Sequence, residues 1–390
     1  MPKYKAFAGA SLTQFIVIGL MFAFGVLFKE FETQFGWSRT LLSSCTALGF
    51  FVMGLLAFFA GSLSDKYGPR PVLALTGIAY GIGYVLMSQV TQSWQIILIF
   101  ATFLGLGLGT HDVVTLSTVA RWFENGRGVM TGLAKVGTAL GQMAVPPLAA
   151  VLVIKYGLQD ALVILGIAAG VILLFAALLM SHPPKTDQTK NSESHIVKDR
   201  GEARKTLTFK KLCIIQFLFF PTLMTIPTHI AVHGIDLGMS FAKSAYLLTT
   251  IGAASVAGRL TVGIFLDLMG SRHAYILCFV PILVSLIALL IVTNHTALFL
   301  MMALYGFGHG GLFAAVSPSV AGYFGMKEHG ALFGTILFCG TVSGAIGPIV
   351  TGYAFDTFGS YDLAFGGLAT FITLGLLLVL TLPKWDSHSI

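Results

Sequence analysis

The chain has 390 residues, of which 56% are hydrophobic and only 10% are charged, and its mean hydropathy is +0.86. This composition leaves too little polar surface for a water-soluble domain of this length, so it excludes soluble enzymes and binding modules. The net charge is +7, but no basic groove or stacking motif of a nucleic-acid-binding protein accompanies it. The sequence therefore predicts an integral membrane protein whose main partner is the lipid bilayer.

Apolar runs of about 20 residues recur along the chain, and each is long enough to cross a ~30 Å hydrocarbon core as a helix. The alternating pattern of barrel strands is absent, which favours an all-α membrane protein. Twelve spans are expected, beginning near residues 7, 39, 71, 95, 128, 158, 209, 242, 273, 297, 330 and 361. Residues 1–5 are too short for a cleaved signal peptide, so we expect the first span to be retained. All four cysteines fall within predicted spans, which argues against a disulfide framework.

A polar, charged segment at residues 182–208 separates the first six predicted spans from the last six. It predicts an N-terminal bundle (1–181), a linker (182–208) and a C-terminal bundle (209–390). If the two termini and every second loop lie on one side of the membrane, that side collects most of the 23 basic residues. By the positive-inside rule this side is the cytoplasm, so the net charge follows from topology. The expected location is the plasma membrane, or the inner membrane in a bacterium.

One short motif occurs in both halves of the chain. Its copies share four residues at an offset of 202 positions: Gly61, Asp65, Gly68 and Arg70 in GSLSDKYGPR, and Gly263, Asp267, Gly270 and Arg272 in GIFLDLMGSR. The shared offset predicts that one half duplicates the other. The glycines permit close helix approach and a sharp turn, while the charged residues can latch one helix end against a neighbour. Arg121, at the end of the fourth span, is the candidate partner of Asp65; a plain turn with exposed charges is the alternative.

Six spans, a charged linker and six more spans, with a loop motif in each half, resemble the major facilitator superfamily along the whole chain. Residues 28–39 and 121–141 also resemble its monocarboxylate transporter and oxalate:formate antiporter branch. The resemblance implies two pseudo-symmetric six-helix bundles that move a solute by alternating access. It also implies a functional monomer that needs no cofactor or metal, and a substrate-binding arginine in the eighth span. Arg259, within GRLTVG, matches that position.

Arg259 lies eight residues before Asp267, which places it about 12 Å from the end of the span. Burying an arginine within a membrane costs at least ~2.5 kcal/mol, so such a residue marks a functional site. Its guanidinium matches a carboxylate, which makes Arg259 the predicted primary substrate ligand; a fixed ion pair is the alternative. Oxalate:formate antiporters carry a second basic residue in the eleventh span. This chain departs from that pattern, because residues 330–355 contain no lysine or arginine. Ser255 stands where monocarboxylate transporters carry an acidic residue, and we assign it to the site.

The seventh span carries the main candidates for proton coupling. His229, His233 and Asp236 are spaced to share one helix face, and imidazole titrates near physiological pH. We predict that His229 contacts substrate and proton and that Asp236 relays the proton, while His233 is equally well explained as an interfacial residue. Asp112, in the fourth span, is a further proton candidate.

Four weaker candidates complete the predicted substrate site. Lys135 lies at a depth similar to that of Arg259, although its side chain could equally reach back to the membrane surface. Tyr305, His309 and Phe338 could line a small pocket, but such residues are also common in ordinary packing.

These features predict a proton-coupled symporter of a small monocarboxylate such as lactate or pyruvate. An organic-anion antiporter would share nearly every feature, and a non-transporting carboxylate sensor is disfavoured because the loops are short. The absence of a Walker A sequence and of a metal-spaced His/Cys set argues against an ATP-driven pump or a metalloenzyme. We expect substrate binding at positions of the second half that differ from their counterparts in the first half. Arg259, for example, corresponds to Ala57 at the offset of 202 residues.

Overall fold

The computed structural model describes residues 2–123, 127–181, 200–325 and 329–383, and all the secondary structure in these ranges is helical. The first half contains α1 (Pro2–Phe35), α2 (Arg39–Tyr67), α3 (Pro69–Met87), α4 (Ser93–Ile99), the π-helical η1 (Phe100–Leu104), α5 (Gly105–Trp122) and α6 (Arg127–Leu179). The second half contains the short α7 (Arg200–Lys205), then α8 (Leu207–Asp236), α9 (Phe241–Leu289), α10 (His295–Phe324), α11 (His329–Phe358) and α12 (Asp362–Val379).

The described residues include 11 helical segments that are long and apolar enough to cross a membrane. The longest, Met130–Leu179, contains the non-helical Gly157. Gly137 and Ala176, on either side of Gly157, both pack against the first turns of α1, at Ser11 and Gly9. The chain therefore reverses at Gly157, α6 crosses twice, and the twelve predicted spans are confirmed.

The internal duplication is visible in the backbone. Three pairs of glycines with positive φ are 202 positions apart: Gly36 (67°) and Gly238 (87°), Gly68 (91°) and Gly270 (76°), and Gly157 (82°) and Gly359 (69°). Residues with a side chain are disfavoured at such φ values, so these positions specify the same reversals in both halves. Two serines repeat as well: Ser38 and Ser240 each accept a backbone N–H in the first turn of the helix that follows.

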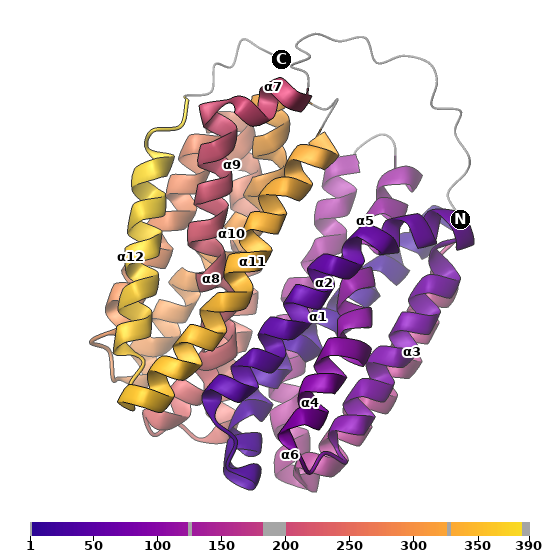
Figure 1. Ribbon diagram of the computed structural model, residues 1–390, viewed down its shortest axis with the longest axis vertical. Helices are drawn as coiled ribbons and strands as arrows, with labels where there is room; N and C mark the ends of the chain where they lie inside the picture. The colour runs from indigo at the N-terminus through magenta and orange to yellow at the C-terminus, as the bar shows by residue number, and fades with distance from the viewer. Residues whose placement is uncertain (1, 124–126, 182–199, 326–328, 384–390) are drawn as a thin grey trace.

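The two halves form two helical bundles that lie side by side, α1–α6 in purple and α8–α12 in pink to yellow (Figure 1). The start of α1, the end of α12 and α7 lie at one end of the molecule, here called the termini face (Figure 1). α8 begins two residues before the predicted end of the linker, and residues 182–199 of that linker lie outside the described ranges.

Small residues bring the two bundles into contact. Gly54 of α2 faces Thr341 of α11, and Gly252 of α9 lies against the backbone of α6 at Ala139 and Met143. Without a hydrophobic driving force between helices in lipid, such close approach is a main source of packing energy.

Within the second bundle, α9 and α10 pack even more tightly. Gly258 lies against the backbone of Phe307, and Gly310 lies against that of Ser255. This contact holds Arg259 and His309, the neighbours of these glycines, at fixed positions on adjacent helices.

Candidate functional site

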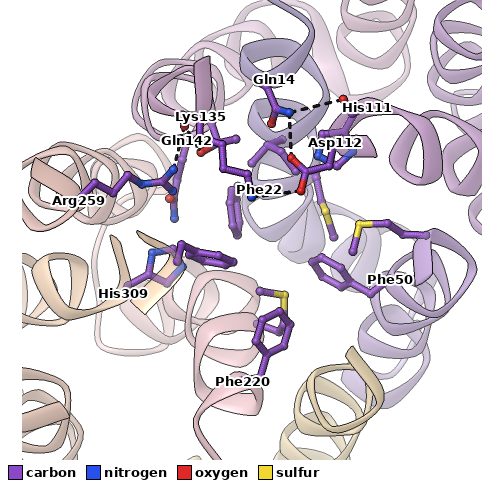
Figure 2. Close-up of a pocket in the computed structure, with 16 residues that line it drawn as sticks. Gln14, Phe22, Phe50, His111, Asp112, Lys135, Gln142, Phe220, Arg259 and His309 are labelled. Atoms are coloured by element: carbon purple, nitrogen blue, oxygen red, sulfur yellow. Dashed lines mark hydrogen bonds and ion pairs between the residues drawn. The ribbon is translucent and has the colours of Figure 1, made fainter. Parts of the chain in front are cut away.

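A cavity that is partly open to solvent lies between the two bundles (Figure 2). Helices of both halves line it: Gln14, Ile18, Met21 and Phe22 (α1), Phe50 and Met53 (α2), His111 and Asp112 (α5), Lys135, Thr138 and Gln142 (α6), Phe220 and Met224 (α8), Arg259 (α9), and His309 and Phe313 (α10). Four residues singled out from the sequence therefore meet here, namely Arg259, Lys135, Asp112 and His309.

Arg259 points into the cavity with part of its donor capacity unused. Its Nη1 donates to the carbonyl oxygen of Lys135 at 2.8 Å, and its Nε donates to Ser255 Oγ at 3.3 Å. Its guanidinium carbon lies 5.7 Å from the ring centroid of Phe313. Among the described residues no carboxylate forms an ion pair with Arg259. A guanidinium has five N–H donors, so the remaining ones can bind an anionic ligand.

Lys135 is held inside the cavity by an acidic partner. Its Nζ lies 3.1 Å from Asp112 Oδ2, and the two side chains are 30% and 37% exposed. Gln14 Nε2 donates to Asp112 Oδ1 at 3.0 Å and to Thr115 Oγ1 at 3.0 Å. The alternative in which Lys135 reaches back to the membrane surface does not fit this geometry. Together with Arg259, the pair leaves one net positive charge in the cavity.

Three buried side chains in the cavity wall carry polar atoms without a hydrogen-bond partner among the described residues. The atoms are Oε1 of Gln14, Nε2 of Gln142 and both ring nitrogens of His309; Gln14 is 0% exposed, and Gln142 and His309 are each 1% exposed. Unpaired buried polar atoms are costly, so these atoms are available to a ligand. The sequence did not predict Gln142 as a site residue, although its spacing of seven residues from Lys135 places both on one face of α6.

Three other predicted residues do not line the cavity. Ser255 is buried and accepts the hydrogen bond from Arg259. Tyr305 is also buried, and its hydroxyl donates to the carbonyl oxygen of Thr222 at 2.9 Å, which ties α10 to α8. Phe338 is 49% exposed because α11 turns its glycine face, including Gly340, towards α8, and Phe338 lies roughly 200° around the helix from Gly340.

A second group of charged and polar residues lies at the end of the molecule opposite the termini face, where α1 ends and α2 begins. We call this group the gate cluster; it consists of Glu32, Arg39, His229, Asp236, Asp356 and Tyr361. Arg39 is its centre and is only 1% exposed. Its Nη1 and Nη2 donate to the two oxygens of Asp236 at 2.6 and 2.9 Å, and its Nε and Nη2 donate to Glu32 at 3.2 and 3.3 Å.

The gate cluster joins the two bundles. Glu32 and Arg39 belong to the first half, whereas Asp236 belongs to the second. Asp356, near the end of α11, accepts the backbone N–H groups of Arg39 and Thr40 at 3.0 and 2.8 Å, and thus caps α2 from the other bundle. Arg39 also stacks on the ring of Phe355 at 3.6 Å. Arg39 ends the segment 28–39 that resembles the monocarboxylate transporter branch, but the sequence assigned it no role, because its buried ion pairs depend on tertiary partners.

His229 and Asp236 therefore lie in the gate cluster and not in the cavity. His229 is fully buried; its Nδ1 is 3.1 Å from the Tyr361 hydroxyl, and its Nε2 is 3.1 Å from both Ser43 Oγ and the carbonyl oxygen of Pro348. Burial raises the pKa of Tyr361 above its ordinary value, so this phenol stays protonated and accepts a hydrogen bond from Arg39 at 2.7 Å. The expectation that His229 contacts substrate does not fit its position here.

The repeated loop motif lies at the termini face. Arg70 donates from Nε and Nη2 to the carbonyl oxygens of Met180 and Leu178, at 3.1 and 3.0 Å, and so holds the end of α6. A Cβ on Gly61 would meet only Val113 at 3.6 Å, so close helix approach does not require a glycine there.

The acidic members of the predicted latch, Asp65 and Asp267, have side chains outside the described part of the structure. Contacts from Asp65 to Arg121, and any corresponding role of Arg272, remain predictions.

The fold and the site define a membrane transporter built from two similar bundles around a central cavity. The sequence profile of the Major Facilitator Superfamily matches residues 10–263 and 213–388, and the chain belongs to this superfamily. It is therefore a multi-pass secondary transporter and not an enzyme.

Individual proteins show the same relationship. The chain is 26% identical over 382 residues to monocarboxylate transporter 13 of Rattus norvegicus, covering 95% of this chain and 87% of that one. It is 23% identical over 352 residues to MFS-type transporter 1 of Ophiocordyceps sp. (strain BCC 1869), covering 88% and 77%. The crystal structure of a D-xylose-proton symporter matches with a TM-score of 0.79 over 99% of both chains at 12% identity, which is a likeness of fold.

Proposed function

We propose that this transporter moves a small monocarboxylate, such as lactate or pyruvate, together with a proton. The observation that carries the proposal is the Arg259 guanidinium, which faces the cavity and has no carboxylate partner among the described residues. The single net positive charge of the cavity suits a single carboxylate. The similarity to a protein named as a monocarboxylate transporter supports the same substrate class.

In this proposal the substrate carboxylate binds between α6 and α9. Arg259 supplies charged donors from α9, and Gln142 supplies the unpaired Nε2 from α6. Hydrogen bonds to a charged acceptor are stronger than those between neutral groups, so the two donors favour an anionic ligand. Because these helices belong to different bundles, the substrate bridges the parts that must move.

Asp112 is the proposed proton acceptor of the cycle. It neutralises Lys135 while it is ionised. A proton on Asp112 would weaken this pair and free the Lys135 ammonium for the incoming carboxylate. His229 and Asp236 are less suited to this role because the gate cluster holds them away from the cavity. One anion moving with one proton carries no net charge, so the membrane potential neither drives nor opposes transport.

We further propose that both termini are cytoplasmic and that this state is open to the cytoplasm. The positive-inside distribution supports the orientation. The gate cluster joins the bundles at the opposite face, and the partial exposure of Lys135 and Asp112 indicates that solvent reaches the cavity. Residues 1–181 and 209–390 are the proposed rocking units, and alternating access requires the gate cluster to break.

The test is uptake of radiolabelled lactate into proteoliposomes with an imposed pH gradient. Arg259→Lys should lower uptake by roughly 10- to 100-fold, because hydrogen bonds to charged groups contribute about 1.5–3 kcal/mol and an ammonium cannot reproduce the guanidinium geometry. The matched control is Arg204→Lys, since Arg204 is exposed and bonds Thr335 of its own bundle. Wild-type uptake by Arg259→Lys would overturn the proposal. Counterflow that ignores the pH gradient would instead indicate the antiporter.

A further inference from the structure

One side of the cavity is apolar and lies away from the residues proposed to bind the carboxylate. Phe50 and Phe220 lie across the cavity from Arg259 and Gln142 in Figure 2. With Met53, Met224 and Phe22 they form what we call the apolar wall. Lactate and pyruvate offer this wall a single methyl group, which is too small to contact all five side chains.

The apolar wall is held in place by its neighbours. Phe220 lies against Gly340 and Gly344 of α11, where added Cβ atoms would meet its ring at 3.1 and 2.5 Å. Its ring centroid is also 6.1 Å from that of Phe313. A wall fixed in this way can select a side chain by size, because it cannot collapse to fill the space that a small substrate leaves.

His309 lies between the charged side of the cavity and the apolar wall. Its ring centroid is 5.1 Å from that of Phe313 and 6.4 Å from that of Phe22. The Arg259 guanidinium carbon lies 5.7 Å from the same Phe313 centroid. Both ring nitrogens lack a hydrogen-bond partner among the described residues. A substrate whose carboxylate is bound at Arg259 would therefore bring the atoms next to its carboxylate towards His309.

From this arrangement we infer that the preferred substrate is a 2-hydroxy monocarboxylate with a large apolar side chain, with His309 binding the hydroxyl and the apolar wall binding the side chain. This inference rests on the proposed function and names its substrate class. A hydroxyl is favoured over an oxo group because it can both donate and accept, so it suits His309 whichever nitrogen carries the proton. A substrate lacking that oxygen would leave the buried imidazole unpaired, which sites of this kind penalise heavily.

The experiment measures how well unlabelled acids inhibit uptake of radiolabelled lactate in proteoliposomes. Three competitors are compared: lactate, 3-phenyllactate and 3-phenylpropionate, which lacks only the hydroxyl of 3-phenyllactate. We expect 3-phenyllactate to inhibit at a concentration at least about tenfold below that of lactate, because additional apolar groups buried in a fixed pocket improve binding by this much or more. It should also inhibit at least about tenfold better than 3-phenylpropionate, and labelled 3-phenyllactate should be taken up.

The role of His309 is tested by the inhibition ratio of 3-phenylpropionate to 3-phenyllactate. His309→Ala should reduce this ratio to near one, while His309→Gln, which keeps a donor and an acceptor, should restore much of it. His273→Ala is the matched control, because His273 is exposed beside the reversal at Gly270 within α9. Since the ratio is measured within one variant, a lower amount of folded protein does not change it.

Two results would overturn the inference. One is a wild-type protein that 3-phenyllactate inhibits no better than lactate, and the other is an unchanged ratio in His309→Ala. If lactate uptake in those experiments still depends on Arg259, only the substrate class is wrong. If none of the acids is transported, the proposed function itself fails.

Discussion

Asp112 and Lys135 form an ion pair in the cavity, and the proposed mechanism requires a proton to break this pair. Gln14 donates to one oxygen of Asp112 while Lys135 occupies the other, so the carboxylate is held as the ionised form. A proton that binds Asp112 must displace this arrangement, and substrate binding is then favoured because Lys135 becomes available. In the proposed mechanism, the energetic link between proton and substrate therefore lies in the side chains of Asp112, Lys135 and Gln14.

Asp112→Asn should uncouple transport from the proton gradient. In the wild type, an inward gradient of one pH unit supplies about 1.4 kcal/mol, or roughly tenfold accumulation of substrate, and uptake rises as the external pH falls. The amide cannot titrate, so accumulation and its pH dependence should both disappear while exchange of substrate persists. Measurement of lactate accumulation against an imposed gradient checks this.

Asp160→Asn is the control for that measurement, because Asp160 is exposed beside the reversal at Gly157. If Asp112→Asn still accumulated lactate against a gradient, the proton would have to travel through another group.

At the scale of helices, glycine contacts set the positions of the cavity residues. α9 carries Gly252 towards the other bundle and Gly258 towards α10, and Arg259 follows directly. Such contacts leave no room for a methyl group on either side. The helix that bears Arg259, the proposed substrate ligand, is therefore located by backbone contact, which is more rigid than contact between long side chains.

Gly252→Ala should disturb transport without touching the cavity. Its Cβ would lie 2.8 Å from both the carbonyl oxygen of Ala139 and the backbone nitrogen of Met143, so α9 and α6 must separate. Overpacking of this kind costs about 1–3 kcal/mol. We expect a lower melting temperature in detergent and a lower maximal uptake rate.

Gly366→Ala on α12 provides the comparison, since no atom lies within 4 Å of a Cβ built there. Equal melting temperatures for the two variants would show that the α6–α9 contact tolerates separation.

In the whole molecule, the gate cluster joins the two bundles at the end opposite the termini face. Arg39 is a buried cation shared by carboxylates from both bundles, and removing one partner of a buried pair costs about 3–5 kcal/mol. Those interactions exist only while the bundles touch at this face. They therefore stabilise this state relative to the one that opens on the opposite side.

Arg39→Ala should shift the population towards the outward-open state. A cysteine introduced at Thr138 in the cavity, in a background without the four native cysteines, reports the change through its rate of labelling by an external, membrane-impermeant thiol reagent. We expect labelling to become at least about tenfold faster, because a shift of 1.4 kcal/mol in the equilibrium already changes a population tenfold.

Lys29→Ala is the matched control in this assay, since Lys29 pairs with Glu32 inside one bundle and does not cross to the other. An unchanged labelling rate in Arg39→Ala would mean that other contacts hold this face closed.

Much of the architecture could be predicted from local information. Span length and apolar composition are properties of short segments, and the 202-residue offset of Gly68 and Gly270 already implied two equivalent bundles. Arg259 was also detectable, because an arginine within an apolar span is costly wherever the helix packs. These features need no knowledge of which helices become neighbours.

The partners of each charge depended on the tertiary structure. His229 and Asp236 share a helix face, which the sequence pattern displayed, but whether that face meets the cavity or the other bundle depends on α2, α11 and Tyr361. The roles of Arg39 and Gln142 depend on tertiary neighbours in the same way, so the sequence pattern did not predict them. Phe338 and Tyr305 were predicted to line the pocket from residue type alone, and neither does. Hydrophobic periodicity indicates which face of a helix is apolar. The polar groups of the cavity come from five helices (α1, α5, α6, α9 and α10), so they are brought together only when the two bundles pack against one another.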